Sequence, residues 1–173
     1  MRLAYADPPY PGMAKSMYQC EEIDHPELIA RLCSYDGWAL STKSNSLRDL
    51  LPLCPPEARV AAWVKPFAFM RPNIWPNYAW EPVIFVRPKR PVRRKVRTPH
   101  DWLSCNPWGV SSKERKAGGV KGQKPEPFSL WLFGILDART EDSFDDLFPG
   151  SGRVGRCWES WAADQKPPPE ALA

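Results

Sequence analysis

Arg2-Leu3-Ala4-Tyr5-Ala6-Asp7-Pro8-Pro9-Tyr10 opens the sequence with a short apolar run that stops at an acid and two prolines. A run of this length with prolines at its end is typical of a buried strand, so we predict a strand over Arg2–Ala6. Proline fixes φ and has no N–H donor, so the turn after the strand offers acceptors only. The Asp7 carboxylate and the Pro8 carbonyl would each accept one hydrogen of an amino group.

An amino group held in this way becomes a better nucleophile. The lone pair of an exocyclic amine on a nucleic-acid base is delocalised into the ring. Acceptors at both hydrogens favour a tetrahedral nitrogen, whose lone pair is then free to attack a methyl sulfonium. Tyr10 would stack on the base. An ordinary strand-ending turn is the alternative, because Asp-Pro is common turn chemistry.

A second motif lies near the other end of the sequence, at Asp145-Asp146-Leu147-Phe148-Pro149-Gly150-Ser151-Gly152. We predict a strand over Phe144–Phe148, followed by a glycine turn whose N–H groups would bind the carboxylate of a cofactor. The turn matches neither a P-loop nor the dinucleotide fingerprint, and a plain loop is the alternative. Ligands of doubly wound sheets sit beyond the carboxyl ends of strands. We therefore expect the two predicted strands side by side and parallel, at the centre of the sheet.

The rest of the chain alternates between predicted helices and strands, which indicates a mostly parallel α/β sheet. Asp24 is expected to cap a helix that Gly37 ends. The other helices are predicted over Ser46–Cys54 and Pro127–Leu136. The other strands are predicted over Trp38–Ser41, Arg59–Val64, Pro82–Val86 and Cys157–Ala162.

Length and composition favour one domain over residues 1–173, since 43% of the residues are hydrophobic and nine are Trp. No targeting peptide and no apolar run of membrane-spanning length is visible, so we expect a cytoplasmic protein without a membrane partner. The five cysteines include no CxxC pair, so neither a metal site nor a disulfide framework is expected. The Pro-rich tail at 166–173 is expected to be flexible.

Positive charge is concentrated in one segment. Between Arg87 and Lys124 there are twelve Lys and Arg residues against two acids, although the net charge of the chain is only +4. We predict that residues 87–123 form a basic, substrate-facing loop, since phosphate contacts use such residues and aromatic side chains stack on bases. A solvated charged loop is the alternative. The expected nucleic-acid contacts are Arg87, Lys89, Arg90, Arg93, Arg94, Lys95, Arg97, Trp102 and Trp108, with His100 as a further stacking residue.

The chain resembles amino-methyltransferases of the Asp-Pro-Pro-Tyr type. It is most similar to the permuted group in which the catalytic motif precedes the cofactor motif, as in small phage-type adenine methylases and MT-A70-like proteins. Supporting similarities are Lys124-Pro125, Leu147-Phe148, Trp158-Glu159-Ser160-Trp161 and the segment Trp80–Val86. The resemblance implies a Rossmann-like class I methyltransferase sheet that is circularly permuted and reduced.

By this resemblance, the chain would use S-adenosyl-L-methionine to methylate adenine N6 in DNA, in a bacterial or phage-infected cell. Asp7, Pro8, Pro9 and Tyr10 would be the catalytic residues. The cofactor would be bound by Asp7, Lys124, Asp146, Phe148, Pro149, Gly150, Ser151, Gly152, Asp164 and Gln165, the last two at its ribose. The sequence departs from the family pattern in one place. Only five residues separate Gly152 from Trp158, which is too few for the full helix usual there.

Several alternatives remain open at this level. Cytosine N4 and RNA adenine are amines that need the same acceptors. A catalytically silent nucleic-acid-binding subunit is the main rival from another class of protein. A cytosine-C5 methylase is disfavoured, because its nucleophile is a Cys after Pro and the sequence has no Pro-Cys dipeptide. Both a monomer and a dimer are compatible with the sequence.

Overall fold

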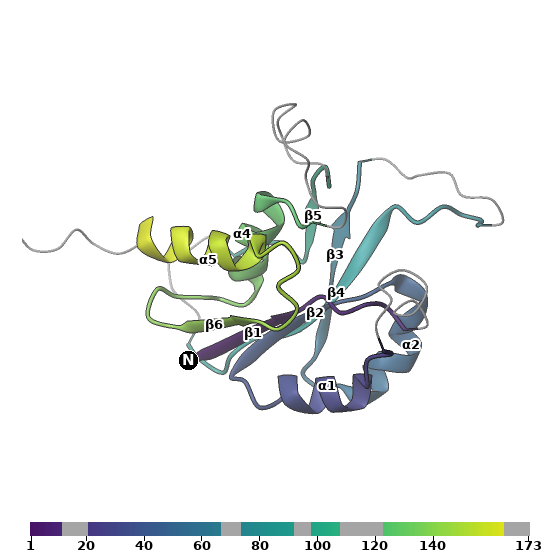
Figure 1. Ribbon diagram of the computed structural model, residues 1–173, viewed down its shortest axis with the longest axis horizontal. Helices are drawn as coiled ribbons and strands as arrows, with labels where there is room; N and C mark the ends of the chain where they lie inside the picture. Colours follow the sequence, from purple (N-terminus) through teal and green to yellow (C-terminus); the bar gives the residue numbers. More distant parts are fainter. Residues whose placement is uncertain (12–20, 67–73, 92–97, 108–122, 165–173) are drawn as a thin grey trace, which may run out of the picture.

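The computed structural model describes residues 1–11, 21–66, 74–91, 98–107 and 123–164. Within them, one sheet has the strand order β5-β3-β4-β2-β1-β6 (Figure 1). The strands are β1 (Arg2–Ala6), β2 (Gly37–Ser41), β3 (Arg59–Val64), β4 (Trp80–Val86), β5 (Trp102–Ser104) and β6 (Ser143–Asp146). The predicted strands at Arg2–Ala6 and Arg59–Val64 are confirmed to the residue.

Strand direction brings most strand ends to one edge of the sheet. β1 runs parallel to both β2 and β6, and β3 runs parallel to β5. β4 is antiparallel to β2 and β3, so it begins where the other strands end. We call this edge the carboxyl edge. It is marked by Asp7, Lys65, Cys105 and Leu147, each of which follows a parallel strand, and by Trp80 at the start of β4.

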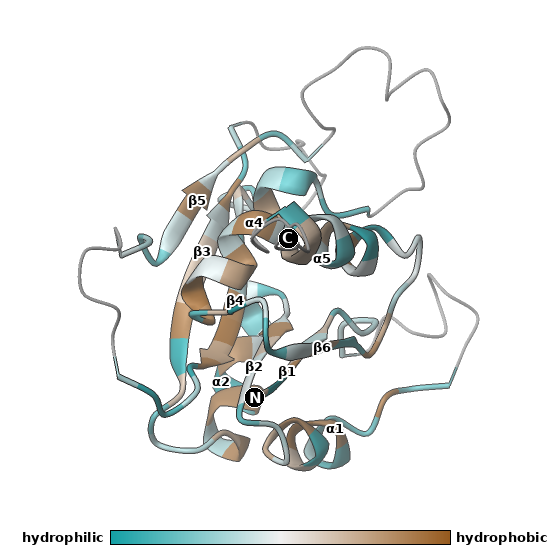
Figure 2. Cartoon of the chain, turned by 90° about the vertical axis from the view of Figure 1, so that its left-hand side faces the viewer, coloured by the Kyte–Doolittle hydropathy of each residue, from teal (hydrophilic) through white to brown (hydrophobic). Residues whose placement is uncertain are grey.

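Two helical layers cover the sheet, as Figures 1 and 2 show. One layer holds α1 (His25–Leu32) and α2 (Leu47–Leu50), and the other holds α4 (Glu126–Ile135) and α5 (Arg153–Asp164). The strand β1 serves both layers because its side chains alternate. Leu3 and Tyr5 pack beneath α4, whereas Ala4 and Ala6 pack against α1. Every side chain of β1 beyond its first residue is therefore buried.

Local sequence explains the first helical layer. Asp24 caps α1 as expected, with its carboxylate accepting the Glu27 N–H at 2.9 Å. The helix ends at Leu32, so Gly37 does not terminate it but begins β2. A Cβ at Gly37 would lie 2.5 Å from Cδ of Pro88, which explains why glycine is needed there. Of the helix predicted over 46–54, only Leu47–Leu50 are α-helical; a 3₁₀ turn lies on either side, and the second contains Pro52, which has no N–H to continue the α-helix.

The strand predicted over Cys157–Ala162 is wrong, since these residues lie inside α5. The helix begins at Arg153, directly after the glycine turn, and continues through Trp158 to Asp164. The five residues between Gly152 and Trp158 are therefore the first part of a full helix, which was not expected there. Val154, Trp158 and Trp161 recur at helical spacing and face the core, where Trp158 stacks on Phe144 at 5.0 Å. The Trp-x-x-Trp segment is therefore helical.

The parallel pairing of β1 with β6 is confirmed, with Leu3 opposite Phe144 and Tyr5 opposite Asp146. Its predicted position at the centre of the sheet is wrong. Among the described strands, β6 is the last at its side of the sheet. The strand also ends at Asp146, two residues earlier than expected, because Leu147 and Phe148 already belong to the turn.

The segment expected as a loop over 87–123 contains a strand. β5 pairs with β3, with Trp102 opposite Ala62 and Ser104 opposite Val64. β5 thereby extends the sheet beyond β3. In the part of the chain that the structure covers, no helix has the length and apolar character of a membrane span.

Candidate active site

Asp7 lies at the carboxyl edge, directly after β1, and its side chain is 24% exposed. Its Oδ1 is 3.1 Å from Nζ of Lys124. Lys124 precedes α4, which starts at Glu126, and its side chain is almost fully buried. The first and last thirds of the sequence thus meet in one ion pair.

Glu81 completes a network that the sequence analysis did not find. It lies in β4, and its Oε1 is 2.5 Å from Nζ of Lys124. Its Oε2 is 3.1 Å from Nζ of Lys65, which follows β3. We call Asp7, Lys124, Glu81 and Lys65 the charge cluster, which contains two acids and two bases. A signal was visible in the sequence, because Glu81 is the one charged residue of Trp80-Glu81-Pro82-Val83-Ile84-Phe85-Val86.

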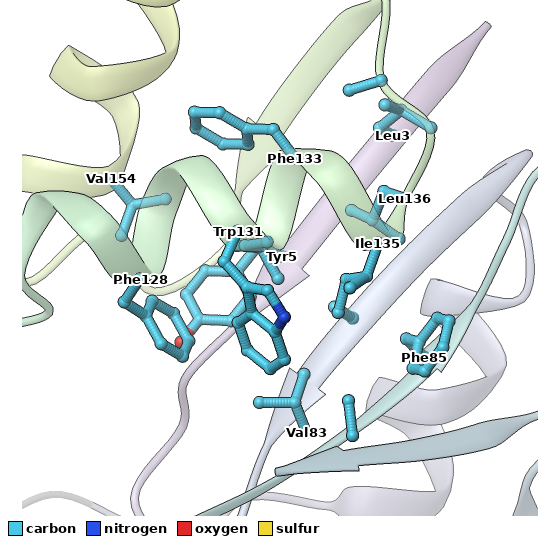
Figure 3. Packing of buried hydrophobic residues seen from close by; sticks show 14 of the residues in the cluster. Leu3, Tyr5, Val83, Phe85, Phe128, Trp131, Phe133, Ile135, Leu136 and Val154 are labelled. Atoms are coloured by element: carbon cyan, nitrogen blue, oxygen red, sulfur yellow. The ribbon is translucent and has the colours of Figure 1, made fainter. Parts of the chain in front are cut away.

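Aromatic rings enclose the ammonium groups of this cluster. Nζ of Lys124 lies 5.4 Å from the ring centre of Trp63 and 5.5 Å from that of Phe128. Nζ of Lys65 lies 4.8 Å from the Trp63 ring. The faces of aromatic rings attract cations, so Trp63 and Phe128 stabilise the ammonium groups and offset part of the cost of burying them. Figure 3 shows Phe128 beside Tyr5, whose hydroxyl shares a 2.8 Å hydrogen bond with Ser41.

Burial and charge act against one another in the pKa values of the cluster. Burial raises the pKa of Asp7; Lys124 opposes this rise, and Glu81 and Asp146 add to it. Burial would also raise the pKa of Glu81, but Lys124 and Lys65 outweigh it and lower the pKa. Burial would lower the pKa of Lys124, but the two carboxylates raise it. Asp7 is therefore the carboxylate closest to protonation.

Tyr10, the last residue of the predicted catalytic turn, faces the same cluster. Its phenol is close to Glu81, and burial followed by the negative charge of Glu81 raises its pKa well above the usual value. The phenol therefore stays protonated and remains a hydrogen-bond donor. Lys43 fixes the end of this turn by donating to the Pro11 carbonyl at 3.0 Å.

The glycine turn lies on the neighbouring strand end. Its first residue continues the β1–β6 pairing, since Leu147 N–H donates to the Tyr5 carbonyl at 2.9 Å. Phe148 N–H donates to Asp146 Oδ1 at 3.3 Å. Gly150 and Gly152 have φ of 48° and 70°, a region that favours glycine. The turn leads directly into α5, so the first N–H groups of that helix point toward the carboxyl edge.

One of the expected cofactor residues takes another position. Asp164 is the last residue of α5, not the residue after a strand, so the reason for placing it at a ribose does not hold. It lines a hollow of about 520 Å³ between α4 and α5, together with Arg153, Arg156 and Trp161. Gln165 lies outside the described residues.

Several expected nucleic-acid contacts are ion pairs within the fold. Arg87 Nη2 is 3.3 Å from Asp137 Oδ2. Arg90 Nη2 is 2.8 Å from Asp142 Oδ2, and the Arg90 side chain is only 6% exposed. A guanidinium this deeply buried cannot reach a phosphate, so the assignment of Arg90 is corrected. Lys89 is exposed and 3.6 Å from Glu57. Arg93, Arg94, Lys95, Arg97 and Trp108 lie outside the described residues.

Exposed aromatic residues gather near the start of β4 and on β5. Trp102 is 53% exposed, and its ring stacks on His100 with a centroid distance of 5.9 Å. Both were predicted as stacking residues, whereas three further exposed aromatic residues that precede or begin β4 were not: Trp75, Tyr78 and Trp80 are 95%, 49% and 38% exposed. Trp75 and Tyr78 lie in the segment that leads into β4, and Trp80 opens the strand beside Glu81.

No protein-family model and no curated protein matches the chain. Among solved structures, the chain is similar to the M1.HpyAVI–SAM complex, with a TM-score of 0.56 and 20% sequence identity. The match covers 92% of this chain and 78% of that one. At this identity the likeness concerns the fold: both chains share a mixed α/β, Rossmann-like sheet. Among the described residues, no group of His, Cys, Asp or Glu is suited to hold a metal ion.

Proposed function

We propose that this protein is an S-adenosyl-L-methionine-dependent methyltransferase that acts on adenine N6 in DNA. One observation carries the proposal. The Asp7-Pro8-Pro9-Tyr10 turn and the glycine turn at 147–152 follow neighbouring parallel strands, β1 and β6. Groups for an amine and groups for a cofactor are therefore offered at one place on the carboxyl edge. The fold likeness to a protein crystallised with SAM supports the same proposal.

The glycine turn fits the methionine end of this cofactor. A Cβ at Gly150 would meet no atom closer than 3.9 Å, so the backbone there is open to a ligand. The α-carboxylate of the cofactor would be bound by the N–H groups at the start of α5, where the helix dipole favours an anion. When bound, the cofactor supplies the methyl sulfonium.

The residues after β1 would hold the amine. The Asp7 carboxylate and the Pro8 carbonyl accept its two hydrogens, which localises the nitrogen lone pair. Asp7 must be ionised for this role, and Lys124 favours its ionised form. The ammonium of Lys124 is buried against both Asp7 and Glu81. We therefore propose that Lys124 binds these two acids and does not bind the cofactor.

The choice of nucleic acid rests on surface chemistry. Trp75, Tyr78, Trp80 and Trp102 offer exposed rings, and amine chemistry requires a base that has left its stack. The basic residues of 93–97 follow the same part of the chain in sequence and suit phosphate contacts. DNA is favoured by the resemblance to phage-type adenine methylases.

The decisive experiment measures transfer of a labelled methyl group from S-adenosyl-L-methionine to duplex DNA, single-stranded DNA and RNA, followed by nucleoside analysis. We expect N6-methyladenosine in its deoxy form. N4-methylcytosine or methylated RNA would keep the reaction class and change the substrate. Nucleic-acid binding without transfer to any of the three would identify a catalytically silent binding subunit and refute the proposal.

A further inference from the structure

Glu81 is a buried acid in an otherwise apolar strand, β4. Its side chain is 9% exposed and lies in a strand whose other side chains are apolar or aromatic. An unpaired carboxylate buried there would be strongly destabilising. Each of its oxygens instead contacts a different lysine, Oε1 with Lys124 and Oε2 with Lys65.

Lys124 is divided between two strands. Its Nζ contacts Oε1 of Glu81 on β4 and Oδ1 of Asp7 after β1, and β2 separates these strands in the sheet. An ammonium has three hydrogens, so two acceptors on separate strands fix its position and orientation. The contact with Asp7 is made through Oδ1, at 3.1 Å.

We infer that Glu81 is a positioning residue for the methyl transfer proposed above. By binding Lys124, Glu81 holds the ammonium on Oδ1 of Asp7 and leaves Oδ2 for a hydrogen of the target amine. Without Glu81, Lys124 would be free to move onto both oxygens of Asp7 and compete with the amine. The inference rests on the proposed function, because it concerns the same carboxylate.

The charged and titratable groups around Asp7 determine the sign of each effect. They come from every element packed at this corner: Lys124 before α4, Glu81 on β4, Lys65 after β3, Tyr5 on β1, Tyr10 after it, and Asp146 on β6. Removing the negative charge of Glu81 lowers the pKa of Asp7. Removing the positive charge of Lys65 raises it, as does removing Lys124.

The two substitutions are expected to shift the pKa of Asp7 in opposite directions, which distinguishes a specific electrostatic effect from a general loosening of the fold. A loosened site lets water reach Asp7, which lowers a pKa that burial has raised. A loosened site would therefore shift the pKa of Asp7 in the same direction as Glu81→Gln. It would not reproduce the upward shift expected for Lys65→Met. Lys65 is also the more exposed partner, with 29% of its side chain accessible, so its replacement disturbs packing less.

The experiment follows the carboxyl carbon of Asp7 by NMR during a pH titration of the full chain, with Asp7→Asn used for assignment. It compares wild type, Glu81→Gln and Lys65→Met. We expect the midpoint of Asp7 to move downward in Glu81→Gln and, by a smaller amount, upward in Lys65→Met. Methyl transfer is measured in parallel. For Glu81→Gln, kcat should fall about tenfold while KM for DNA is unchanged, because Glu81 reaches the amine only through Lys124.

Asp142→Asn is the matched control. Asp142 is also a buried, ion-paired acid, but it lies beside the start of β1, at the opposite end of the strand from Asp7. It should leave the Asp7 midpoint and kcat at their wild-type values. Melting curves show which variants fold, and Lys65→Met decides the question if Glu81→Gln does not. If the titration midpoint of Asp7 is the same in wild type, Glu81→Gln and Lys65→Met, the positioning role of Glu81 is wrong. Absence of methyl transfer by the wild type would instead refute the proposed function.

Discussion

Arg90 donates from Nη2 to Oδ2 of Asp142 at 2.8 Å, while Oδ1 of the same carboxylate accepts the N-terminal ammonium of Met1 at 2.9 Å. The Arg139 N–H also donates to Oδ2. Asp142 directly precedes β6, so this junction ties the basic segment, the chain start and the edge strand together. Part of the local excess of positive charge thus serves the fold.

Replacing Asp142 should destabilise the protein in a pH-dependent way. Burial alone would raise the pKa of Asp142, but its hydrogen bonds to Met1, Arg90 and Arg139 lower it from the usual 3.8. A lowered folded-state pKa contributes stability above the unfolded pKa and loses it as pH falls through the folded value. Asp142→Asn should cost about 3 kcal/mol near neutral pH, and less as the pH falls through the folded-state pKa. Urea unfolding measures this, with exposed Asp49→Asn as the neutral control.

Asp7→Ala should abolish methyl transfer while S-adenosyl-L-methionine binding remains measurable. Asp7 is proposed to contact the amine, and one lost hydrogen bond to developing charge costs about a hundredfold in rate or more. Asp36→Ala is the control, because its carboxylate accepts Arg2 N–H at the other end of β1. Turnover of Asp7→Ala within about tenfold of wild type would remove Asp7 from the mechanism.

Two glycines of one segment should respond in opposite ways to alanine. Gly152 has a φ of 70°, and its Cβ would lie 2.9 Å from Nη1 of Arg156. Gly152→Ala should weaken cofactor binding by about tenfold, since strain of about 1 kcal/mol or more distorts the turn. Gly155 lies inside α5 with open space around it, so Gly155→Ala should raise stability by up to about 1 kcal/mol. Calorimetry of both variants with the cofactor tests this, and equal affinities would contradict a cofactor role for the turn.

Neutralising Arg93, Arg94 and Lys95 together should weaken binding to all DNA sequences and flatten its dependence on salt. Three lost phosphate contacts change the log–log slope by roughly 2 to 3 units on duplex DNA. Arg31→Gln, in the last turn of α1 and before the start of β2, is a control at the opposite edge of the sheet. An unchanged slope in the triple variant would mean that these residues are merely solvated.

Trp102→Ala should lower affinity for single-stranded DNA. One lost base–aromatic stack costs about 1–3 kcal/mol, which is roughly tenfold in affinity or more. Leu130→Ala removes a similarly exposed apolar side chain from α4, and we expect it to bind like wild type. Fluorescence anisotropy of labelled oligonucleotides distinguishes the two variants. Equal affinities would assign Trp102 to the sheet alone.

Local pattern was enough to predict much of the sheet. Arg2–Ala6 and Arg59–Val64 are confirmed to the residue because short apolar runs ended there at an Asp-Pro or at a charged residue. The neighbouring position of β1 and β6 followed from the chemistry that their ends would share. The strand predicted over Cys157–Ala162 overlooked a helical pattern, because Trp158 and Trp161 lie three residues apart and Val154 precedes Trp158 by four.

The charge cluster could not be derived from sequence alone. Lys124 was found through its Lys-Pro setting, but its partners Asp7 and Glu81 are distant in sequence and are brought together by the sheet order. The same limit applies to Arg90, whose partner Asp142 is also distant in sequence. Counting charges along a segment identifies an excess, whereas burial and pairing depend on tertiary neighbours.

The pairing of β1 with β6 has a consequence for the protein during synthesis. β1 is made first and β6 last among the described strands, so one edge of β1 stays unpaired until the residues up to Asp146 have been synthesised. Contacts between such distant segments form slowly, because the entropy cost of closing a long loop comes before the stabilising contacts are made. An open, apolar strand edge meanwhile invites pairing with other chains. Nascent or truncated chains that lack β6 should therefore depend on chaperones.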